Sequence, residues 1–406
     1  MAEEVEVETA LQYLLEATRT CDTGRCPLIN CWDRILAEDI IADVDFPPFD
    51  RSSLDGYAVI SQDVVNASSK QPVLLEQIDY IPAGSVGRHT ITAGQTARIM
   101  TGAPVPMGAD GIVRLEDTNC SGTQVMVLAG VSTAKSICRQ GAEIAFGEIV
   151  LRQGTRLNAG AMGLLAMLGQ TKPLVYRRPR VAILATGSEI IDIDQPLAPG
   201  KIRNSNSFML QAQVFAAGGE PVLLGGVVDD TKLICDTLEA APFCDIYITT
   251  GGVSVGDYDL MGQVFDRLAV KAMFNRVVLK PGTPILAGKW RDTLLMGLSG
   301  NPAGASVAFE LLVRPVIHKL AGHGTRPRSM IRAILTTDLE CAASSVTRRF
   351  AWGRCREELV SWQVEPLAYQ GSGMLKTLTD ANALIVIPVG IPHVSKGSEV
   401  DVILLN

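Results

Sequence analysis

A glycine-rich loop near the middle of the chain follows an apolar segment, in the sequence DIYITTGGVSVGDYDLM. Its glycines, Gly251, Gly252 and Gly256, stand between a predicted strand and a predicted helix. Glycines at such a point let backbone N–H groups approach an anion closely, and the helix that follows adds a favourable field. A plain turn between strand and helix has the same composition, so this loop alone leaves both interpretations open.

A second loop of the same kind occurs in LLMGLSGNPAGASVAFELL, where Gly300, Asn301 and Pro302 connect a predicted strand to a predicted helix. Proline near the first position of a helix is a common start signal. The carboxyl ends of parallel strands meet at one edge of a sheet. We therefore expect the two loops to face the same ligand.

Two cations stand close together in the segment around VVLKPGTP, where Arg276 lies four positions before Lys280. Positions four apart on one strand face the same side, so we expect both side chains to converge on one anion. A solvated sheet edge is the alternative, which the apolar flanks of the segment disfavour.

Acidic residues gather in the same predicted turns and in loops earlier in the chain. Carboxylates stand beside an anionic ligand when a divalent cation bridges them or when one of them transfers a proton. The sequence therefore implies Mg²⁺, although each Asp taken singly is a common turn former or helix cap. These residues are Asp55, Glu143, Glu189, Asp229, Asp230, Asp257 and Asp259.

The composition indicates a folded chain of several domains. The 406 residues include 47% hydrophobic and 19% charged residues and 38 glycines, which is typical of a globular α/β protein with two to four domains. A net charge of −7 gives no broad attraction to nucleic acid, which we do not expect as a partner.

The nine cysteines are odd in number and are expected to be thiols. Four residues separate Cys21 from Cys26 and Cys26 from Cys31, and this spacing, with no nearby histidine, disfavours a zinc site. The acidic start of the chain is unlike a signal peptide, and no apolar run is long enough to span a membrane. We expect a cytoplasmic protein without a membrane partner.

The elements that must position these residues can be outlined from periodicity. Apolar spacing predicts a helix over 7–17 and a second helical stretch over 32–41. The diproline of FPPFDRSSLDGYAV predicts an ordered loop before a strand at 57–60, and residues 60–140 have the short strands and turns of a small β domain. AGAMGLLAMLG predicts a further helix.

From residue 178 the pattern changes to strand, glycine turn and helix in alternation. It begins with VAILATGSE and a helix over 207–217, and continues through DIYITTGG to the helix after LSGNP. This alternation predicts a doubly wound parallel sheet that binds its ligand at the carboxyl ends of the strands. From about residue 328 short strands predict a separate β domain.

The motifs together resemble those of the molybdopterin molybdenumtransferases of the MoeA type, to which the E domain of gephyrin belongs. Their order and spacing cover nearly the whole chain. The matching segments are PPFDRSSLDGYAV, ARIMTGAPVPMGADGIV, GAEI, ILATGSEI, VVDD, TTGGVSVGDYD, LKPGTP, GLSGNPAG and GSGMLKTLTDANALIVIP.

The resemblance implies an α/β multidomain fold in an elongated four-part chain. Residues 1–45 with 141–177 would form a helical and β domain, 46–140 a β-rich inserted domain, 178–327 a doubly wound, MogA-like α/β domain that binds molybdopterin, and 328–406 a C-terminal β-barrel. It also implies a homodimer whose active cleft lies between subunits, and possible contact with the molybdopterin adenylyltransferase.

The implied reaction is the insertion of molybdate into adenylylated molybdopterin, with Mg²⁺-dependent release of AMP. The sulfur ligands of the metal belong to the pterin, so no protein cysteine is required. By motif position, the implied catalytic residues are Asp55, Glu189, Asp259, Lys280 and Arg276. The implied substrate-binding residues are Thr101, Gly251, Gly252, Ser254, Gly256, Pro281, Gly300, Asn301 and Pro302. The implied metal ligands are Asp229, Asp230, Asp259 and Glu143.

Three residues depart from the family pattern: Arg276 stands where Lys is usual, Ser299 where proline begins the LPGNP motif, and Glu143 where Asp is usual. Arg and Lys are not equivalent at a tight anion site, so a preference for tungstate is an alternative. A scaffold without catalysis is another. An adenylyltransferase or a competence-protein-like nucleotide amidase would leave the LDGYA, MTGAP and GSGML segments without a role.

Overall fold

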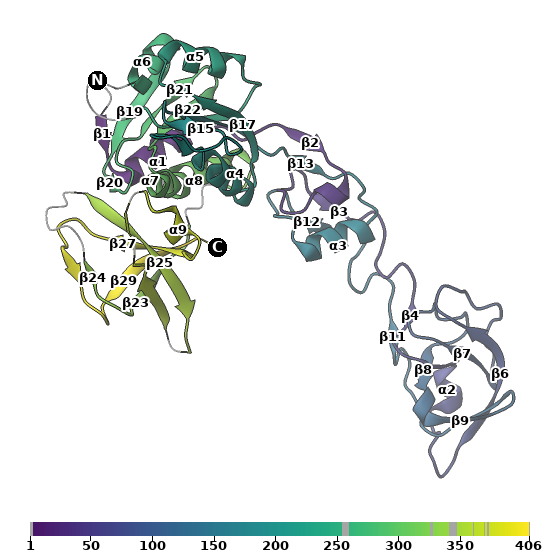
Figure 1. Cartoon of the computed structure of the whole chain (residues 1–406). Helices are drawn as coiled ribbons and strands as arrows, with labels where there is room; N and C mark the ends of the chain where they lie inside the picture. The colour runs from purple at the N-terminus through teal and green to yellow at the C-terminus, as the bar shows by residue number, and fades with distance from the viewer. Residues whose placement is uncertain are drawn as a thin grey trace. The chain divides into compact units, whose positions relative to one another are not determined.

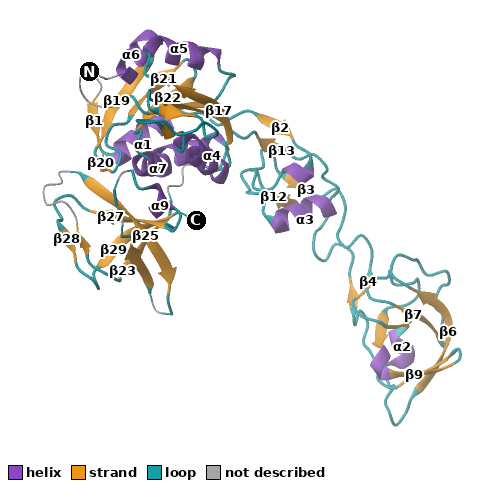
Figure 2. Ribbon diagram, viewed as in Figure 1, coloured by secondary structure: helices purple, strands orange, loops and turns teal. Residues whose placement is uncertain are grey.

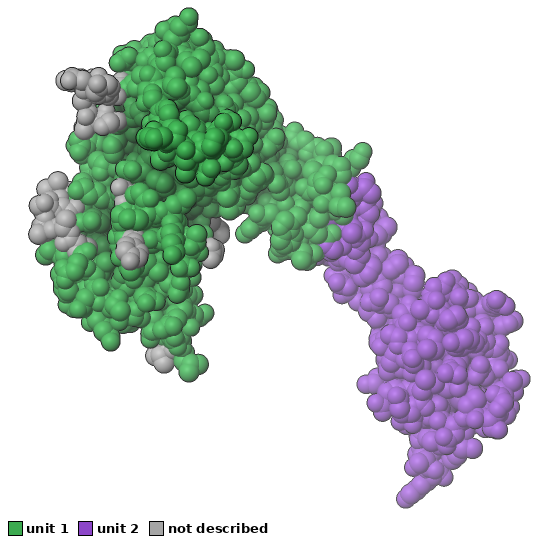
Figure 3. Space-filling model, viewed as in Figure 1, with its two compact units in different colours: residues 1–37, 154–162, 172–406 green, residues 38–153, 163–171 purple. Residues whose placement is uncertain are grey.

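The structure is a computed structural model that describes residues 3–253, 260–324, 328–340, 347–359, 361–368, 370–371 and 373–405 (Figure 1). The chain divides into two compact units, coloured separately in Figure 3. Unit 1 comprises residues 1–37, 154–162 and 172–406, and unit 2 comprises residues 38–153 and 163–171. In the part of the chain described, no helix is long and apolar enough to cross a membrane.

Unit 1 contains a seven-stranded sheet with the order β1-β19-β21-β22-β18-β14-β17. Its four neighbouring strands β22, β18, β14 and β17 are parallel, which confirms the expected α/β core. The strands are β1 (Glu3–Val5), β14 (Arg180–Thr186), β17 (Glu220–Val227), β18 (Ile246–Thr250), β19 (Lys271–Val277), β21 (Leu286–Trp290) and β22 (Thr293–Leu298).

The sequence pattern had predicted a parallel sheet, but the sheet is not parallel throughout. Strand β21 runs antiparallel to both β19 and β22. The reason is local, because only Arg291 and Asp292 separate β21 from β22, and Arg291 has a φ of 55°. A connection this short joins antiparallel neighbours, whereas a parallel pair needs a long crossover.

Helices cover both faces of this sheet (Figure 2). Alternate residues of β14 point to opposite faces: Val181 and Ile183 belong to one apolar core, Ala182 and Leu184 to the other. The first core includes residues of α1 (Val7–Glu16), α4 (Asn206–Ala216), α7 (Pro302–Ala308) and α8 (Arg314–Leu320). The second includes residues of α5 (Thr231–Ala240) and α6 (Leu260–Arg267).

The prediction of a second helical stretch near the N-terminus is wrong. Residues 32–41 contain no α-helix, and Ile35 and Leu36 form bridges with Arg156 and Val175. The local apolar spacing suits a helix, but pairing with distant segments takes up the backbone groups. The nearby elements are η1 (Leu28–Asn30), β2 (Thr23–Arg25), which pairs with β13 (Leu174–Tyr176), and α3 (Ala159–Met167), where a helix was expected.

Unit 2 holds a six-stranded sheet with the order β8-β5-β7-β6-β10-β9, in agreement with the predicted β-rich region. All four residues of β5 are buried, as expected for the strand after the diproline loop. The strands are β5 (Gly56–Val59), β6 (Val73–Ile81), β7 (Gln95–Ile99), β8 (Gly111–Arg114), β9 (Thr118–Ser121) and β10 (Gln124–Val127). Shorter elements are β3 (Ile40–Ile41), β4 (Arg51–Ser52), α2 (Ser61–Val64), η2 (Leu115–Asp117), β11 (Ile137–Cys138) and β12 (Ile149–Leu151).

The C-terminal part of unit 1 is a closed barrel of five strands, because β25 pairs with both β26 and β27 and closes the order β25-β26-β23-β29-β27. Strand β20 (Leu279–Lys280) leaves the α/β sheet and joins β25. The barrel strands are β23 (Met330–Leu335), β25 (Arg348–Glu357), β26 (Trp362–Pro366), β27 (Ala383–Ile387) and β29 (Glu399–Leu404). Beside them lie β24 (Leu339–Glu340), which pairs with β28 (His393–Val394), and α9 (Leu375–Leu378).

Candidate functional site

The carboxyl ends of three neighbouring parallel strands open into one hollow of about 580 Å³. Thr186 ends β14, Thr250 ends β18 and Ser299 follows β22, and all three line the hollow. After β14 the chain adds β17 on one side and then β18 on the other, so the hollow lies where the strand order reverses. Open α/β sheets bind their ligands at this point.

Three of the predicted substrate-binding glycines, Gly251, Gly252 and Gly300, lie in this hollow, together with Glu189 from the turn after β14. Gly251 has a φ of +107°, and a Cβ added to it would lie 2.3 Å from the carbonyl oxygen of Thr186. Only glycine fits this close approach of two strand ends. Gly252, Gly300, Asn301 and Pro302 also line the hollow, as predicted.

A polar wall of the hollow was missed by the sequence prediction. Asn204, Ser205 and Asn206 lie before and at the start of α4, between the short strand β16 (Ile202–Arg203), paired with β15 (Ile190–Ile191), and the helix. The side-chain nitrogen Nδ2 of Asn206 donates to the carbonyl oxygen of Gly300 at 2.8 Å, which connects the wall to the second predicted loop. The polar run NSNS before the helix was the signal available in the sequence.

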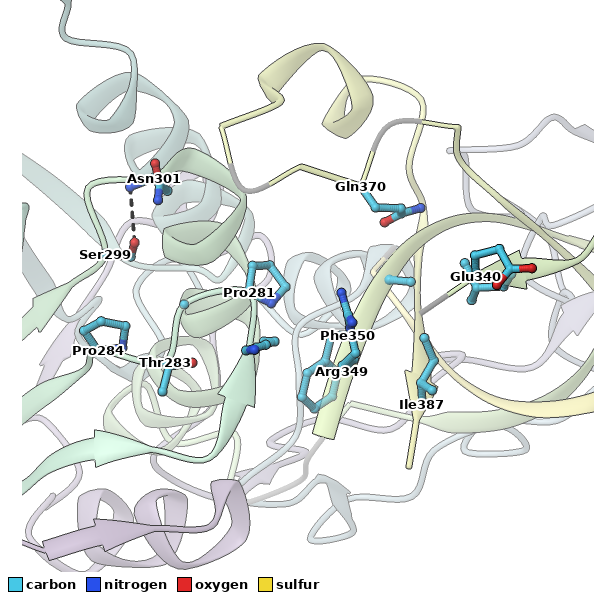
Figure 4. A pocket seen from close by; sticks show the side chains of 14 residues that line it. Pro281, Thr283, Pro284, Ser299, Asn301, Glu340, Arg349, Phe350, Gln370 and Ile387 are labelled. Atoms are coloured by element: carbon cyan, nitrogen blue, oxygen red, sulfur yellow. Dashed lines mark hydrogen bonds between the residues drawn. The ribbon is translucent and has the colours of Figure 1, made fainter. Parts of the chain in front are cut away.

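A second hollow of about 380 Å³ lies between the α/β part and the barrel (Figure 4). Three residues, Pro284, Ser299 and Asn301, line both hollows, so the two hollows adjoin. The α/β part contributes Lys280 and Pro281, both predicted site residues. Arg349, Phe350, Ala351, Gln370 and Ile387 come from the barrel and were not predicted.

Lys280 and Arg349 are direct partners in the parallel pairing of β20 with β25. Nη1 of Arg349 is shielded from solvent and has no hydrogen-bond partner among the described residues. Paired residues on adjacent strands have Cα atoms about 5 Å apart and side chains on the same face, so both cations can reach one anion, which offsets the repulsion between them. A buried N–H donor without an acceptor also costs about 1–3 kcal/mol. This pair therefore favours an oxyanion.

Ser299 stands at the junction of the two hollows and is only 8% exposed. Its Oγ accepts a hydrogen bond from the backbone N–H of Asn301 at 3.2 Å. The hydroxyl proton remains available for donation to a ligand. The departure from proline at this position thus adds a donor beside the cations.

Arg276 does not share the site with Lys280, because the extended segment predicted to carry both is two strands. Strand β19 ends at Val277 within the α/β sheet, whereas β20 belongs to the barrel sheet. Nε of Arg276 lies 3.3 Å from Oε1 of Glu4, and in the described structure Arg276 is not among the residues lining either hollow.

Unit 2 brings together two predicted site residues. Oδ1 of Asp55 accepts hydrogen bonds from the hydroxyl and the backbone N–H of Thr101, each at 2.7 Å. These two hydrogen bonds hold the pKa of Asp55 below its usual value. Glu143 belongs to the same unit but is exposed, and its backbone N–H donates to Phe46.

Two of the predicted magnesium ligands, Asp229 and Asp230, make hydrogen bonds to backbone N–H groups. Asp230 caps α5 by accepting from the backbone N–H of Leu233 at 2.8 Å, and Asp229 accepts from that of Ser188 at 3.0 Å. Within the described part of the chain, no three His, Cys, Asp or Glu side chains cluster in a way that could hold a metal ion. Ser254, Gly256, Asp257 and Asp259 lie outside the described residues.

Three family profiles match consecutive parts of the chain. That of the MoeA N-terminal region (domain I and II) matches residues 5–169. That of a probable molybdopterin binding domain matches residues 182–319, and that of the MoeA C-terminal region (domain IV) matches residues 329–405.

Full-length relatives agree with the profiles. The molybdopterin molybdenumtransferase of Bacillus subtilis (strain 168) is 37% identical over 407 residues, which cover 99% of this chain and 94% of the relative. That of Staphylococcus epidermidis is 38% identical over 98% of this chain and 95% of the relative. This chain belongs to the MoeA family.

Solved structures of MoeA proteins confirm the expected architecture. The crystal structure of the molybdopterin biosynthesis MoeA protein from Pyrococcus horikoshii OT3 aligns with a TM-score of 0.82 and 32% identity over 99% of this chain and 100% of that chain. The four parts expected of a MoeA chain, including the MogA-like domain and the five-stranded barrel, are present. Membership in the MoeA family gives the chain a role in molybdenum cofactor biosynthesis.

Proposed function

We propose that this chain inserts molybdate into adenylylated molybdopterin and releases AMP, in a reaction that depends on Mg²⁺. One observation carries the proposal: Lys280 and Arg349 are paired at a hollow that adjoins the hollow at the glycine turns, with Ser299 and Asn301 lining both. The names of the curated relatives supply the substrate class.

The two hollows suit the two substrates. Molybdate is a tetrahedral dianion, which the ammonium of Lys280 and the guanidinium of Arg349 can hold together. The larger hollow takes the pterin and its nucleotide, and backbone N–H groups at the glycine turns meet the pyrophosphate. Ser299 lies between the incoming oxyanion and the bond to be cleaved, and its hydroxyl donates to the charge that develops there.

Magnesium enters the proposal through the substrate, because the described residues do not supply a ligand set for it. A pyrophosphate carries oxygen atoms of the kind that Mg²⁺ prefers, and we assign no step of the reaction to a protein-bound ion. The proposed protein is cytoplasmic and acts as a homodimer whose active cleft lies between subunits, with possible contact to the molybdopterin adenylyltransferase.

The test is an assay of AMP release by the purified chain with adenylylated molybdopterin, with and without Mg²⁺, and with molybdate or tungstate. We expect Lys280→Ala and Arg349→Ala each to lower molybdate-dependent AMP release about 100-fold, as the loss of a charged donor to a reacting oxyanion typically does. Lys289→Ala is the matched control, because Lys289 is an exposed lysine on β21 paired with Asp292.

Unchanged AMP release in folded Lys280→Ala and Arg349→Ala variants would contradict the assignment of the oxyanion site. A wild-type chain that binds molybdate but releases no AMP would indicate a scaffold instead of an enzyme. Faster release with tungstate than with molybdate would identify the tungstate-preferring alternative.

A further inference from the structure

We infer that Arg328 is a positioning residue for the oxyanion site: its contact with Glu310 sets the place of the barrel, and therefore of Arg349, relative to Lys280. This inference rests on the proposed function, because it concerns how the proposed oxyanion site is held. Arg328 lies in neither hollow. Its effect must therefore pass through the barrel.

Glu310 is the buried centre of this contact. It is 5% exposed and lies in a π-helical turn, η3 (Phe309–Val313), between α7 and α8. Such turns are rare and frequently occur at functional sites. The helical segment that carries Glu310 begins at Pro302, which lines the larger hollow. The carboxylate is thus carried by the helical segment whose first residue lines the larger hollow.

Three side chains donate to the Glu310 carboxylate. Arg314 Nε lies 2.6 Å from Oε2, Gln213 Nε2 lies 2.9 Å from Oε1, and Arg328 Nε lies 2.8 Å from Oε2. Burial alone would raise the pKa of Glu310, but the hydrogen bonds and charges of the two arginines leave the pKa lowered. The carboxylate is therefore ionised at neutral pH and holds both guanidinium groups in place.

Arg328 reaches both ends of the barrel chain. It stands two residues before β23, and its Nη1 donates to the carbonyl oxygen of Leu404, the last residue of β29, at 2.8 Å. One guanidinium group thus connects the first barrel strand, β23, and the last, β29, to the Glu310 carboxylate of the α/β part. A planar group with several fixed donors suits such a junction, and the single ammonium of lysine does not.

The barrel transmits this position to Arg349. Strand β29 pairs with β27, and β27 pairs with β25, where Ile387 and Arg349 are partners. Arg349 is in turn the partner of Lys280 across the boundary between barrel and α/β part. Rotation of the barrel about the apolar contact of Phe350 and Trp352 would change the separation of the two cations. Arg328 opposes that rotation.

The experiment measures molybdate binding to the full-length chain by isothermal titration, for wild type and for Arg328→Met, which keeps the aliphatic part of the side chain. We expect Arg328→Met to bind molybdate at least about tenfold more weakly, because small displacements of a positioned group have large effects. Arg328→Lys should recover part of the loss. Arg332→Met is the control, since Arg332 lies on the same barrel in an exposed pair with Glu399.

A second pair of variants separates positioning from general loss of structure. If Arg328 acts through Arg349, then Arg328→Met should weaken binding in the wild-type background and have no further effect in an Arg349→Ala background. Equal weakening in both backgrounds would overturn the inference. So would molybdate binding by folded Arg328→Met or Arg328→Lys that equals that of wild type.

Hydrogen exchange supplies a measurement that needs no oxyanion. We expect the backbone amides at the β20–β25 pairing, residues 279–280 and 348–349, to exchange faster in Arg328→Lys than in Arg332→Met. Unchanged exchange there would also overturn the inference. If the wild-type chain bound no molybdate, the proposed function would fail, and the exchange result would still decide whether Arg328 positions the barrel.

Discussion

Lys280 and Arg349 illustrate what a single pair of residues contributes. Two like charges repel by about 1 kcal/mol when they lie about 4 Å apart in water-like surroundings, which is the case that applies here because Lys280 is exposed. The protein keeps this repulsion at the edge of a hollow, where a dianion removes it. Nη1 of Arg349, which has no hydrogen-bond partner among the described residues, adds to the gain on binding. Affinity for an oxyanion therefore follows from an arrangement that is unfavourable when the site is empty.

Asp55 gives a pH-dependent prediction at the scale of one residue. Its pKa is lowered by the Thr101 hydroxyl and backbone N–H, so the stabilisation is present above the ordinary value of about 4 and is lost as the pH falls through the lowered pKa. Thr101→Val removes the hydroxyl donor and should raise the pKa of Asp55 toward its ordinary value. A carboxyl-detected NMR titration measures it. Thr92→Val is the control: the Thr92 hydroxyl donates to Gln95, so its removal should leave the pKa of Asp55 unchanged. A pKa of Asp55 in Thr101→Val equal to that in the wild type would refute the assignment.

At the scale of elements, the site depends on close approach between strand ends. The turns after β14, β18 and β22 meet because these strands are adjacent and parallel, and their glycines allow backbone to touch backbone. In the same turns Asp229 accepts a hydrogen bond from the backbone N–H of Ser188, and Asp230 caps α5. Short turns at strand ends therefore determine which side chains remain available to a ligand.

Gly251→Ala tests the close approach. The new Cβ would lie 2.3 Å from the Thr186 carbonyl oxygen, so we expect AMP release to be lost and the free energy of unfolding to fall by about 1–3 kcal/mol more than in Gly225→Ala. Gly225 also has a positive φ, +85°, but nothing lies within 4 Å of an added Cβ, so it is strained for a side chain without the clash. Urea unfolding gives the comparison. Equal losses in the two variants would show that the contact with Thr186 is unimportant.

Asp230 allows a structural role to be separated from the predicted metal role. Asp230→Ala removes the cap of α5 and should lower the free energy of unfolding by about 1 kcal/mol, whereas Asp230→Asn keeps a capping oxygen and should not. Both variants should keep the Mg²⁺ dependence of AMP release. Thermal unfolding and the Mg²⁺ titration are the two measurements. Loss of Mg²⁺-dependent turnover in a stable Asp230→Asn variant would restore Asp230 as a metal ligand.

At the scale of the whole molecule, the site draws on parts of the chain that are far apart in sequence. The α/β part and the barrel both line the smaller hollow, and both belong to unit 1. Asp55 and Thr101 belong to unit 2. For the proposed cleft between subunits, we further propose that unit 2 of one subunit supplies Asp55 and unit 1 of the other supplies Lys280, which makes the homodimer the catalytic unit.

Heterodimers test this proposal. Dimers that combine an Asp55→Ala chain with a Lys280→Ala chain, purified through two different tags, should contain one intact cleft and one doubly altered cleft. We expect them to release AMP at about half the wild-type rate, although each variant alone is inactive. Heterodimers of Lys280→Ala with Arg349→Ala should stay inactive, because both residues come from unit 1. Equal inactivity of the first combination would place the whole site within one subunit.

The sequence by itself determined the class of each part and six of the residues that line the larger hollow, Glu189, Gly251, Gly252, Gly300, Asn301 and Pro302. Glycine, proline and alternating apolar residues express local rules, so the strand ends at Thr250 and Leu298 and the start of α7 at Pro302 could be predicted. The same local rules failed at residues 32–41, where pairing with distant segments overrides helical spacing.

Only the tertiary structure decided which cations meet. Arg276 and Lys280 are four residues apart but lie in different sheets, whereas Lys280 and Arg349 are 69 positions apart and lie side by side. Strand pairing depends on the register of whole elements, which local spacing does not encode. For that reason the barrel's share of the site, and the role of Arg328 in holding it, became visible only in the folded chain.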